Sequence, residues 1–358
     1  MVTLNEAIAS NKRIASSFPD GLVAVFIGGT SGVGEYTVKA FAKYVSKPRA
    51  YVVGRSKEAA DRIIHECQRM NSEGRFEFIA VDVSLLQNID DVCRQIRSKE
   101  SAINILFQSQ GSMGFTKGIS KNVYSSNHGT KIHEETSEGL PLVPALALHG
   151  RTRLILNLLP LIQNARQLRR VVSVGAASYE GPIVTGNIPG IGLPLLEWRD
   201  HFASCLTLLL SKVAQRAPDV GFVHTCPGVV KSGIMRDMEP TLRLRIMVTI
   251  TGFLAPLINT SPNECGERHL FAATSARYAV QKNYGETSGV SSTTPIHVAR
   301  GIDGRNGSGV YSVDAKGESA TPKVEGLLKA FKENGTAEAL WQYVLSDYMR
   351  ITRSEVLV

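Results

Sequence analysis

The sequence has little that would anchor it in a membrane or direct it out of the cell. Its longest apolar stretch, Ile246 to Ile258, is broken by Gly252 and Pro256. A helix needs about 20 apolar residues to cross a bilayer. The N-terminal segment also lacks the apolar core of a signal peptide. We therefore expect a cytoplasmic protein without a transmembrane segment.

Cysteine is scarce as well. The five cysteines are an odd number and include no Cys-x-x-Cys pair, which argues against a disulfide framework and for reduced intracellular thiols. His128 and His133, with Glu134 beside the second, lie in a polar stretch without a further converging ligand. We expect no metal site.

No segment is dominated by charge of one sign. The 40 Lys and Arg residues exceed the 32 Asp and Glu residues by 8. The basic residues are scattered, and no basic run is interleaved with aromatic residues. This distribution gives poor support for nucleic-acid binding. A phosphate-rich cofactor is a sufficient anionic partner.

The sequence does contain a regular alternation of short apolar segments and helix-like segments. Strands are predicted at 22–27, 50–54, 76–81, 103–107, 170–174 and 220–226. Helices are predicted at 5–17, 35–42, 56–71, 89–99, 146–164 (with a late break at Pro160) and 201–216. Continuously apolar strands separated by helices are typical of an α/β parallel sheet with helices on both faces.

A glycine-rich turn joins the strand at 22–27 to the helix at 35–42. It contains Gly28, Gly32 and Gly34. Glycines allow the tight turn and let the backbone approach a pyrophosphate, while the helix N-terminus offers free N–H groups and a positive dipole. The turn therefore predicts a dinucleotide site. The alternative is an ordinary glycine-rich turn between a strand and a helix.

The spacing Gly-x-x-x-Gly-x-Gly resembles the fingerprint of the short-chain dehydrogenase/reductase family. The resemblance covers about residues 22–232 and implies a Rossmann-type, doubly wound parallel sheet. In that family the end of the second strand selects the cofactor, and an Asp there binds the ribose hydroxyls of NAD. Here Arg55 and Ser56 take that place, and both can bind a 2′-phosphate.

The resemblance therefore implies NADP(H), unless Arg55 is only a solvated loop cation. The family also has Asp-Val after the third strand, a glycine after the fourth and Pro-Gly after the sixth. The residues implied to bind the cofactor are Gly28, Thr30, Ser31, Gly32, Val33, Gly34, Arg55, Ser56, Asp82, Val83, Gln110, Gly111, Pro227, Gly228, Val229 and Ser232.

The catalytic residues of the family are missing from the expected positions. The family uses a Tyr with a Lys four residues later, a Ser and an upstream Asn. Alignment places Ala147 at the Asn and Ala176 at the Ser, and the segment Leu193 to Ala203 contains neither Tyr nor Lys. The nearest replacements are Ser178, Tyr179 and His201, and each could instead be structural. His149, Glu197 and Arg199 are weaker alternatives.

We expect one domain over residues 1–358. It comprises an N-terminal lead (1–20), a nucleotide-binding core (21–232), an apolar substrate lid (233–262) and a helical C-terminal extension (263–358).

The predicted function is that of an NADPH-dependent oxidoreductase acting on a medium-sized apolar metabolite without the usual Tyr-Lys pair. The stretch Ser261 to Arg268 resembles a fungal subgroup of reductases from secondary metabolism. One alternative is a redox-neutral isomerisation, cyclisation or cycloaddition, and another is a non-catalytic NADPH-binding protein. The expected partner is this apolar small-molecule substrate, and homo-oligomerisation stays open.

Overall fold

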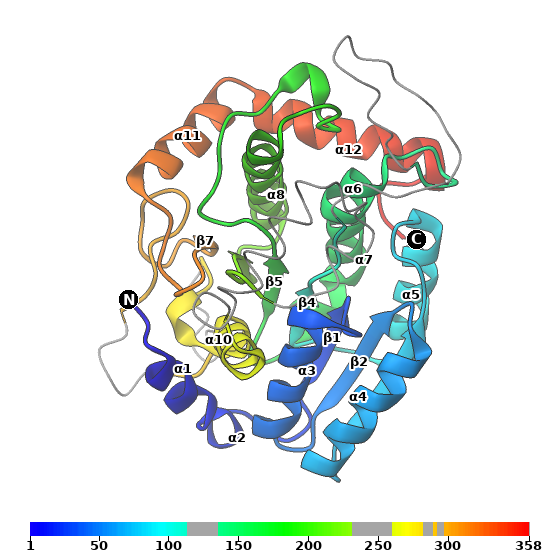
Figure 1. The fold of residues 1–358 in the computed structure, drawn as a ribbon, viewed down its shortest axis with the longest axis vertical. Helices are drawn as coiled ribbons and strands as arrows, with labels where there is room; N and C mark the ends of the chain where they lie inside the picture. Colours follow the sequence, from blue (N-terminus) through cyan, green and yellow to red (C-terminus); the bar gives the residue numbers. More distant parts are fainter. Residues whose placement is uncertain (113–134, 231–259, 282–288, 292–296, 358) are drawn as a thin grey trace, which may run out of the picture.

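The computed structural model describes residues 1–112, 135–230, 260–281, 289–291 and 297–357. Within these residues, seven strands form one sheet in the order β3-β2-β1-β4-β5-β6-β7 (Figure 1). Every adjacent pair is parallel. The strands are β1 (Val23–Ile27), β2 (Arg49–Gly54), β3 (Arg75–Ala80), β4 (Ile105–Gln108), β5 (Arg170–Val174), β6 (Gly221–Thr225) and β7 (Val310–Val313). The predicted α/β, Rossmann-type sheet is confirmed.

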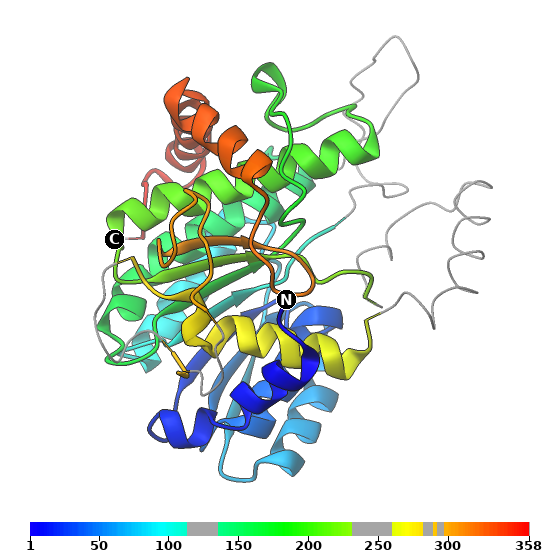
Figure 2. The same cartoon turned by 90° about the vertical axis from the view of Figure 1, so that its left-hand side faces the viewer.

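Helices cover both faces of the sheet, as Figures 1 and 2 show together. One face carries α1 (Leu4–Asn11), α2 (Ile14–Ser17), α3 (Gly32–Tyr44), α4 (Lys57–Met70) and α10 (Pro262–Thr274). The other carries α5 (Leu86–Lys99), α6 (Leu142–Pro144), α7 (Gly150–Asn164) and α8 (Leu195–Arg216), with α11 (Pro322–Glu333) and α12 (Thr336–Thr352) outside α8.

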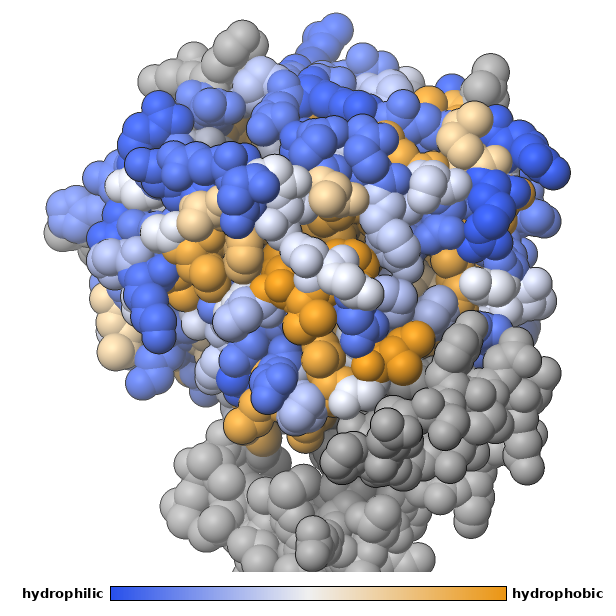
Figure 3. All heavy atoms as spheres, turned by 90° about the horizontal axis from the view of Figure 1, so that it is seen from above, coloured by the Kyte–Doolittle hydropathy of each residue, from blue (hydrophilic) through white to orange (hydrophobic). Residues whose placement is uncertain are grey.

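Two cores, one on each face, explain why the strands are apolar throughout. Along β1, Val25 and Ile27 pack toward α5 and α7, whereas Phe26 packs toward α3 and α10. Successive side chains of a strand point to opposite faces, so a strand covered on both sides needs apolar residues at every position. From above, on the α11–α12 side, polar side chains cover much of the surface and apolar ones gather near its centre (Figure 3).

The strand order reverses between β1 and β4. From β1 the chain first adds β2 and β3 on one side, and then β4 to β7 on the other. In such a sheet the loops at the carboxyl ends of the strands part at the reversal and leave a crevice for a ligand. The glycine turn after β1 lies at this point.

The structure corrects four details of the predicted elements. The 263–358 segment is not only helical, because it supplies the edge strand β7 and also α10, which packs against α3. Helix α8 begins at Leu195, six residues earlier than predicted, and α7 continues through Pro160. The N-terminal helix is divided into α1 and α2.

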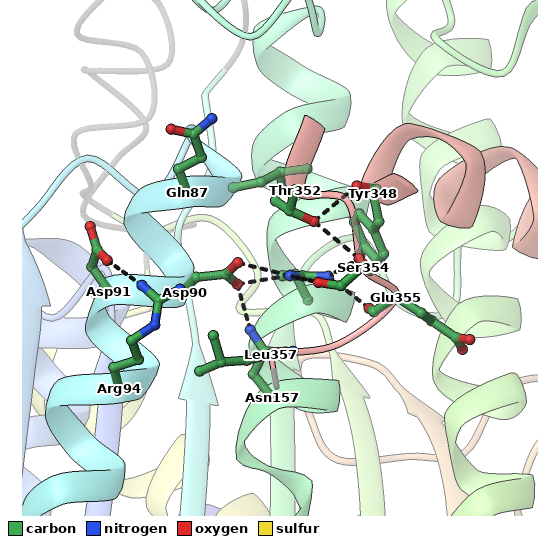
Figure 4. A network of polar contacts seen from close by, with 12 residues as sticks. Gln87, Asp90, Asp91, Arg94, Asn157, Tyr348, Thr352, Ser354, Glu355 and Leu357 are labelled. Atoms are coloured by element: carbon green, nitrogen blue, oxygen red, sulfur yellow. Dashed lines mark hydrogen bonds and ion pairs between the residues drawn. The ribbon is translucent and has the colours of Figure 1, made fainter. Parts of the chain in front are cut away.

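The C-terminal residues are tied to the core by a buried ionic network (Figure 4). Arg153 of α7 binds both carboxylate oxygens of Asp90 of α5 at 2.8 Å. It also donates to the carbonyl groups of Ser354 and Glu355. Asn157 donates to Asp90 and accepts from the N–H of Leu357. A buried pair of this kind is costly to break, so the network fixes the chain end against α5 and α7.

Candidate active site

A cavity of about 630 Å³ opens at the carboxyl ends of the strands. This volume is in the range of ligand-binding clefts. Its wall comes from the turn after β1 and from the residues that follow β2, β3, β4, β5 and β6, together with α6, the segment between α6 and α7, Arg151 of α7 and one side of α8. The lining residues from the strand ends and turns include Gly28, Thr30, Ser31, Val33, Arg55, Ser56, Asp82, Val83, Gln110, Gly111, Pro227, Gly228 and Val229.

All of these were predicted to bind the cofactor, and the fold brings them together. Ser232, which was predicted with them, lies outside the described residues. Gly32 and Gly34 stand in the first turn of α3, directly beside the lining residues Ser31 and Val33.

The conformation of this turn requires glycine at three positions. Gly28 has φ +80°, and a Cβ there would lie 2.8 Å from the amide nitrogen of Gln110. At Gly34 a Cβ would lie 2.3 Å from the carbonyl oxygen of Gly28. Gly32 has φ +55°, in the left-handed region that favours glycine. No side chain caps the N-terminus of α3, which leaves its first N–H groups directed to the cavity side.

The end of β2 presents a cation to the same cavity. Arg55 is exposed, and no carboxylate among the described residues pairs with it. Ser56 caps α4, because its hydroxyl oxygen accepts the N–H of Ala59 at 3.2 Å, and its hydroxyl hydrogen stays available. One oxygen of Asp82 accepts the N–H of Ser84 at 2.9 Å. Arg55 is therefore placed to bind an anion.

Gln110 adds a buried amide to this wall. Its side chain is 6% exposed, and neither polar atom of its carboxamide has a partner among the described residues. Buried polar groups of folded proteins are nearly always hydrogen-bonded. Unpaired donor and acceptor atoms in a cavity wall fit a polar ligand that completes them.

The part of the cavity wall that comes from α6, from the segment between α6 and α7 and from α8 is mostly apolar, and we call this part the inner half. Ala147 and Ala176 line the cavity, at the positions where the resemblance places the Asn and the Ser. Among the described lining residues there is no Tyr and no Lys. The apolar lining side chains are Leu142, Val143, Leu146, Leu195, Leu196, Trp198, Phe202 and Leu206. Along α8, these recur at helical spacing and form one face of the helix.

The structure does not bring the three predicted catalytic residues into the cavity wall. Tyr179 is 47% exposed, and its ring lies under the guanidinium of Arg199 at 4.1 Å. Ser178 has φ +68° and donates its N–H to the hydroxyl of Ser312 at 2.9 Å. His201 is fully buried, with Nδ1 accepting the N–H of Val184 and Nε2 donating to the carbonyl oxygen of Ile188. It therefore holds the segment before α8 in place.

The three weaker catalytic candidates from the sequence lie in different surroundings. Arg199 lines the cavity and binds Asp200. Glu197 is exposed. His149 is buried between the carbonyl oxygen of Pro144 and the carboxylate of Asp347, and it does not line the wall.

We predict that His201→Gln changes stability and not cofactor binding. Burial lowers the pKa of His201 below the ordinary value of 6.5, so the unfolded chain takes up a proton below that pH that the folded chain resists. Its contribution to stability is thus present above pH 6.5 and lost as the pH falls. The free energy of unfolding of the variant should be about 1–3 kcal/mol lower at pH 7. It should also decrease less steeply than that of the wild-type chain as the pH falls below 6.5. Denaturant titrations at several pH values measure this.

The matched control is His65→Gln, because His65 is exposed on α4. It should change neither quantity. NADPH fluorescence titration completes the comparison, and a large loss of NADPH affinity in His201→Gln alone would contradict the structural role.

Two buried polar residues of the cavity wall, Arg151 and His224, were not predicted to be part of the site. Arg151 of α7 donates to the carbonyl oxygens of Gln108 and Gln110 and has no carboxylate partner among the described residues. Burial alone lowers its pKa to about 9, which expresses the cost of its unbalanced charge. His224 of β6 lines the wall beside it. The only sequence signal for His224 was a histidine within an apolar strand, and such residues are usually structural.

Some of the residues named in the sequence analysis lie outside the part of the chain that the structure describes. The lid residues 233–258 and the histidines at 128 and 133 lie outside the described residues. Among the described residues no group of His, Cys, Asp and Glu could hold a metal ion. None of the described helices has the length and apolarity that a membrane span requires.

Comparisons with known proteins agree with this architecture. The profile of the short chain dehydrogenase family matches residues 22–128. An oxidoreductase of Emericella nidulans is 32% identical over 351 residues, which cover 97% of this chain and 98% of that protein. The short-chain dehydrogenase/reductase SAT2 of Stachybotrys chartarum is 26% identical over 97% of this chain and 98% of its own length.

Among solved structures, the Pseudomonas aeruginosa RhlG/NADP active-site complex superposes with a TM-score of 0.51. It is 15% identical, and the match covers 76% of this chain and 95% of that one. At this identity the likeness supports the fold alone.

Proposed function

This chain belongs to the short-chain dehydrogenase/reductase family, and from that premise we propose that it is an NADPH-dependent oxidoreductase. Its substrate is a medium-sized, largely apolar metabolite, of the kind made in fungal secondary metabolism. The relatives are fungal proteins named as an oxidoreductase and a short-chain dehydrogenase/reductase. The observation that carries the proposal is that Arg55, which has no carboxylate partner among the described residues, lines the same cavity as the glycine turn.

The residues present fit such a cofactor. The uncapped N-terminus of α3 and the glycine turn would hold the pyrophosphate. Arg55 and Ser56 would hold the 2′-phosphate, Asp82 the adenine, and Gln110 would complete its unpaired amide on the ribose side. The turn from Pro227 to Val229 would contact the nicotinamide. When bound, the cofactor supplies or accepts a hydride.

The substrate class follows from the inner half of the cavity. Leucines of α6 and α8, with Trp198 and Phe202, make its wall apolar, and each such side chain gains by covering apolar ligand surface. Arg151 and His224 are buried polar groups of the same wall. An apolar skeleton of at least two rings that carries one oxygen matches this distribution, with the oxygen directed to Arg151 and His224.

A redox-neutral reaction remains the second candidate because a specific observation favours it. The wall has no Tyr and no Lys among the described residues, so the proton donor that this family uses is missing there. A cavity that binds NADPH structurally and shapes an isomerisation or cyclisation would look the same. A non-catalytic NADPH-binding protein would share the cofactor half alone.

We expect hydride transfer, and isotope labelling tests it. NADPH carrying deuterium at C4, prepared in each stereochemical form, is incubated with the protein and a panel of apolar ketones such as 1-decalone, which keep a transferred deuterium on the carbinol carbon. One of the two forms should give deuterated product with matching NADPH consumption. Product that forms at full rate without label and without NADPH consumption would establish the redox-neutral alternative instead.

A further inference from the structure

Behind the apolar wall, three residues from three elements form a continuous polar chain. Glu180 lies in the segment after β5, Thr207 on α8 and His224 on β6. Thr207 Oγ1 is 2.8 Å from Glu180 Oε1 and 2.7 Å from His224 Nδ1. All three side chains are buried. We call these three residues the relay.

The direction of the hydrogen bonds in the relay follows from its acid end. Burial raises the pKa of Glu180, but the neighbouring His224 and the hydrogen bonds from Ser312 and Thr207 outweigh it and hold the pKa below its ordinary value. An ionised carboxylate only accepts hydrogen bonds. The Thr207 hydroxyl must therefore donate to Glu180, and its oxygen must accept from Nδ1–H of His224. This assignment leaves the Nε2 lone pair of His224 unprotonated.

That lone pair has no partner among the described residues. It points toward Gly175, where a Cβ would lie only 2.5 Å from Nε2. Gly175, Ala176 and His224 all line the cavity. The small residues at 175 and 176 therefore let the ring, which comes from the neighbouring strand, reach the wall at the place where the family has its serine.

Burial is the main reason why the ring stays neutral. Burial lowers the pKa of His224, Glu180 opposes that shift, and the nearby Arg151 adds to it. The groups that face the ring are thus Thr207 from α8, Glu180 from the segment after β5, and Arg151 from α7. A neutral imidazole with a free Nε2 is a hydrogen-bond acceptor and a general base.

We propose that His224 is the acid–base residue of this cavity and that it binds the substrate oxygen through Nε2. This inference rests on the proposed function. In oxidation, the substrate O–H bond breaks and an N–H bond forms at Nε2, while the carbon-bound hydrogen leaves with its electron pair to an oxidised nicotinamide cofactor. Reduction reverses both transfers, with the protonated ring as acid. Thr207 and Glu180 are positioning residues, since they fix the tautomer.

The test reads the ring directly by nitrogen NMR on protein labelled with ¹⁵N-histidine, with NADP⁺ present. In the wild-type chain Nε2 should be unprotonated at pH 7 and Nδ1 protonated. Thr207→Val removes the hydroxyl at similar volume and should mix or reverse the tautomers, whereas Thr207→Ser should restore the wild-type pattern. His224→Gln identifies the resonance by its loss.

A second measurement compares the effects of two ligands on the Nε2 resonance. 1-Decalol should shift the Nε2 resonance by hydrogen bonding to it, and decalin, which has the same skeleton without oxygen, should not. A protonated Nε2 in the wild-type chain, or an Nε2 resonance that decalol leaves unchanged, overturns the proposal. NADPH fluorescence titration on the same samples separates the two ideas: absent NADPH binding contradicts the proposed function, while NADPH binding with a protonated Nε2 contradicts only the role of His224.

Discussion

Replacing Arg55 with aspartate is expected to weaken NADPH binding by about 10- to 100-fold while changing NADH binding little. The guanidinium can bind the 2′-phosphate with charge-assisted hydrogen bonds, which are stronger than neutral ones and worth about 1.5–3 kcal/mol each. NADH lacks that phosphate. Arg55 has no carboxylate partner among the described residues, so the substitution breaks no ion pair within them. Titration of cofactor fluorescence gives both affinities.

Arg75→Asp is the matched control for this prediction. Arg75 is exposed at the start of β3, whereas Arg55 follows the end of its neighbour β2. The control makes the same change of net charge at the amino ends of the strands, away from the cavity at their carboxyl ends, so it should leave the ratio of the two affinities unchanged. Equal weakening of NADPH and NADH by Arg55→Asp would show that Arg55 does not read the 2′-phosphate.

The cofactor half was predictable from sequence because its signals are local. Gly28, Gly32 and Gly34 stand between a strand and a helix, and Arg55 directly follows a strand. In a parallel sheet all such strand ends meet at one edge, so residues far apart in sequence could be placed together without knowledge of the packing. The same reasoning failed for β7, a strand of only four residues that follows a glycine-rich stretch.

The start of α8 was missed for a related reason. Its first residues, Leu195, Leu196 and Glu197, directly follow a stretch that contains Gly190, Gly192 and Pro194, and such residues indicate a loop in the sequence. Pro194 immediately before the helix was the available signal, because proline is tolerated near a helix start.

The inner half could not be predicted because tertiary packing decides it. Ser178, Tyr179 and His201 were chosen by distance along the chain from the expected tetrad, yet His201 binds the backbone of the segment before α8. His224 looked like a core residue of β6. Its proposed role becomes visible only in the folded chain, where Glu180 and Thr207 come from other elements and Gly175 leaves room for Nε2.

The glycine turn should show the largest effect of all. Gly32→Val is expected to reduce NADPH affinity by more than about 100-fold while the fold persists. Gly32 has φ +55° and lies between two residues of the cavity wall. A branched side chain there opposes the left-handed backbone, at a cost of about 1–3 kcal/mol, and it also fills the space where a pyrophosphate approaches the chain.

Gly335→Val separates these two causes. Gly335 also has positive φ, at +83°, and a Cβ there meets nothing within 4 Å. It precedes α12 and does not line the cavity, so valine should introduce the backbone strain without touching the nucleotide site. Denaturant titration should show similar losses of stability in the two variants, and fluorescence titration should show lost NADPH binding only in Gly32→Val. Full NADPH affinity in Gly32→Val would mean that these glycines serve the fold as an ordinary turn and that the anion lies elsewhere in the cavity.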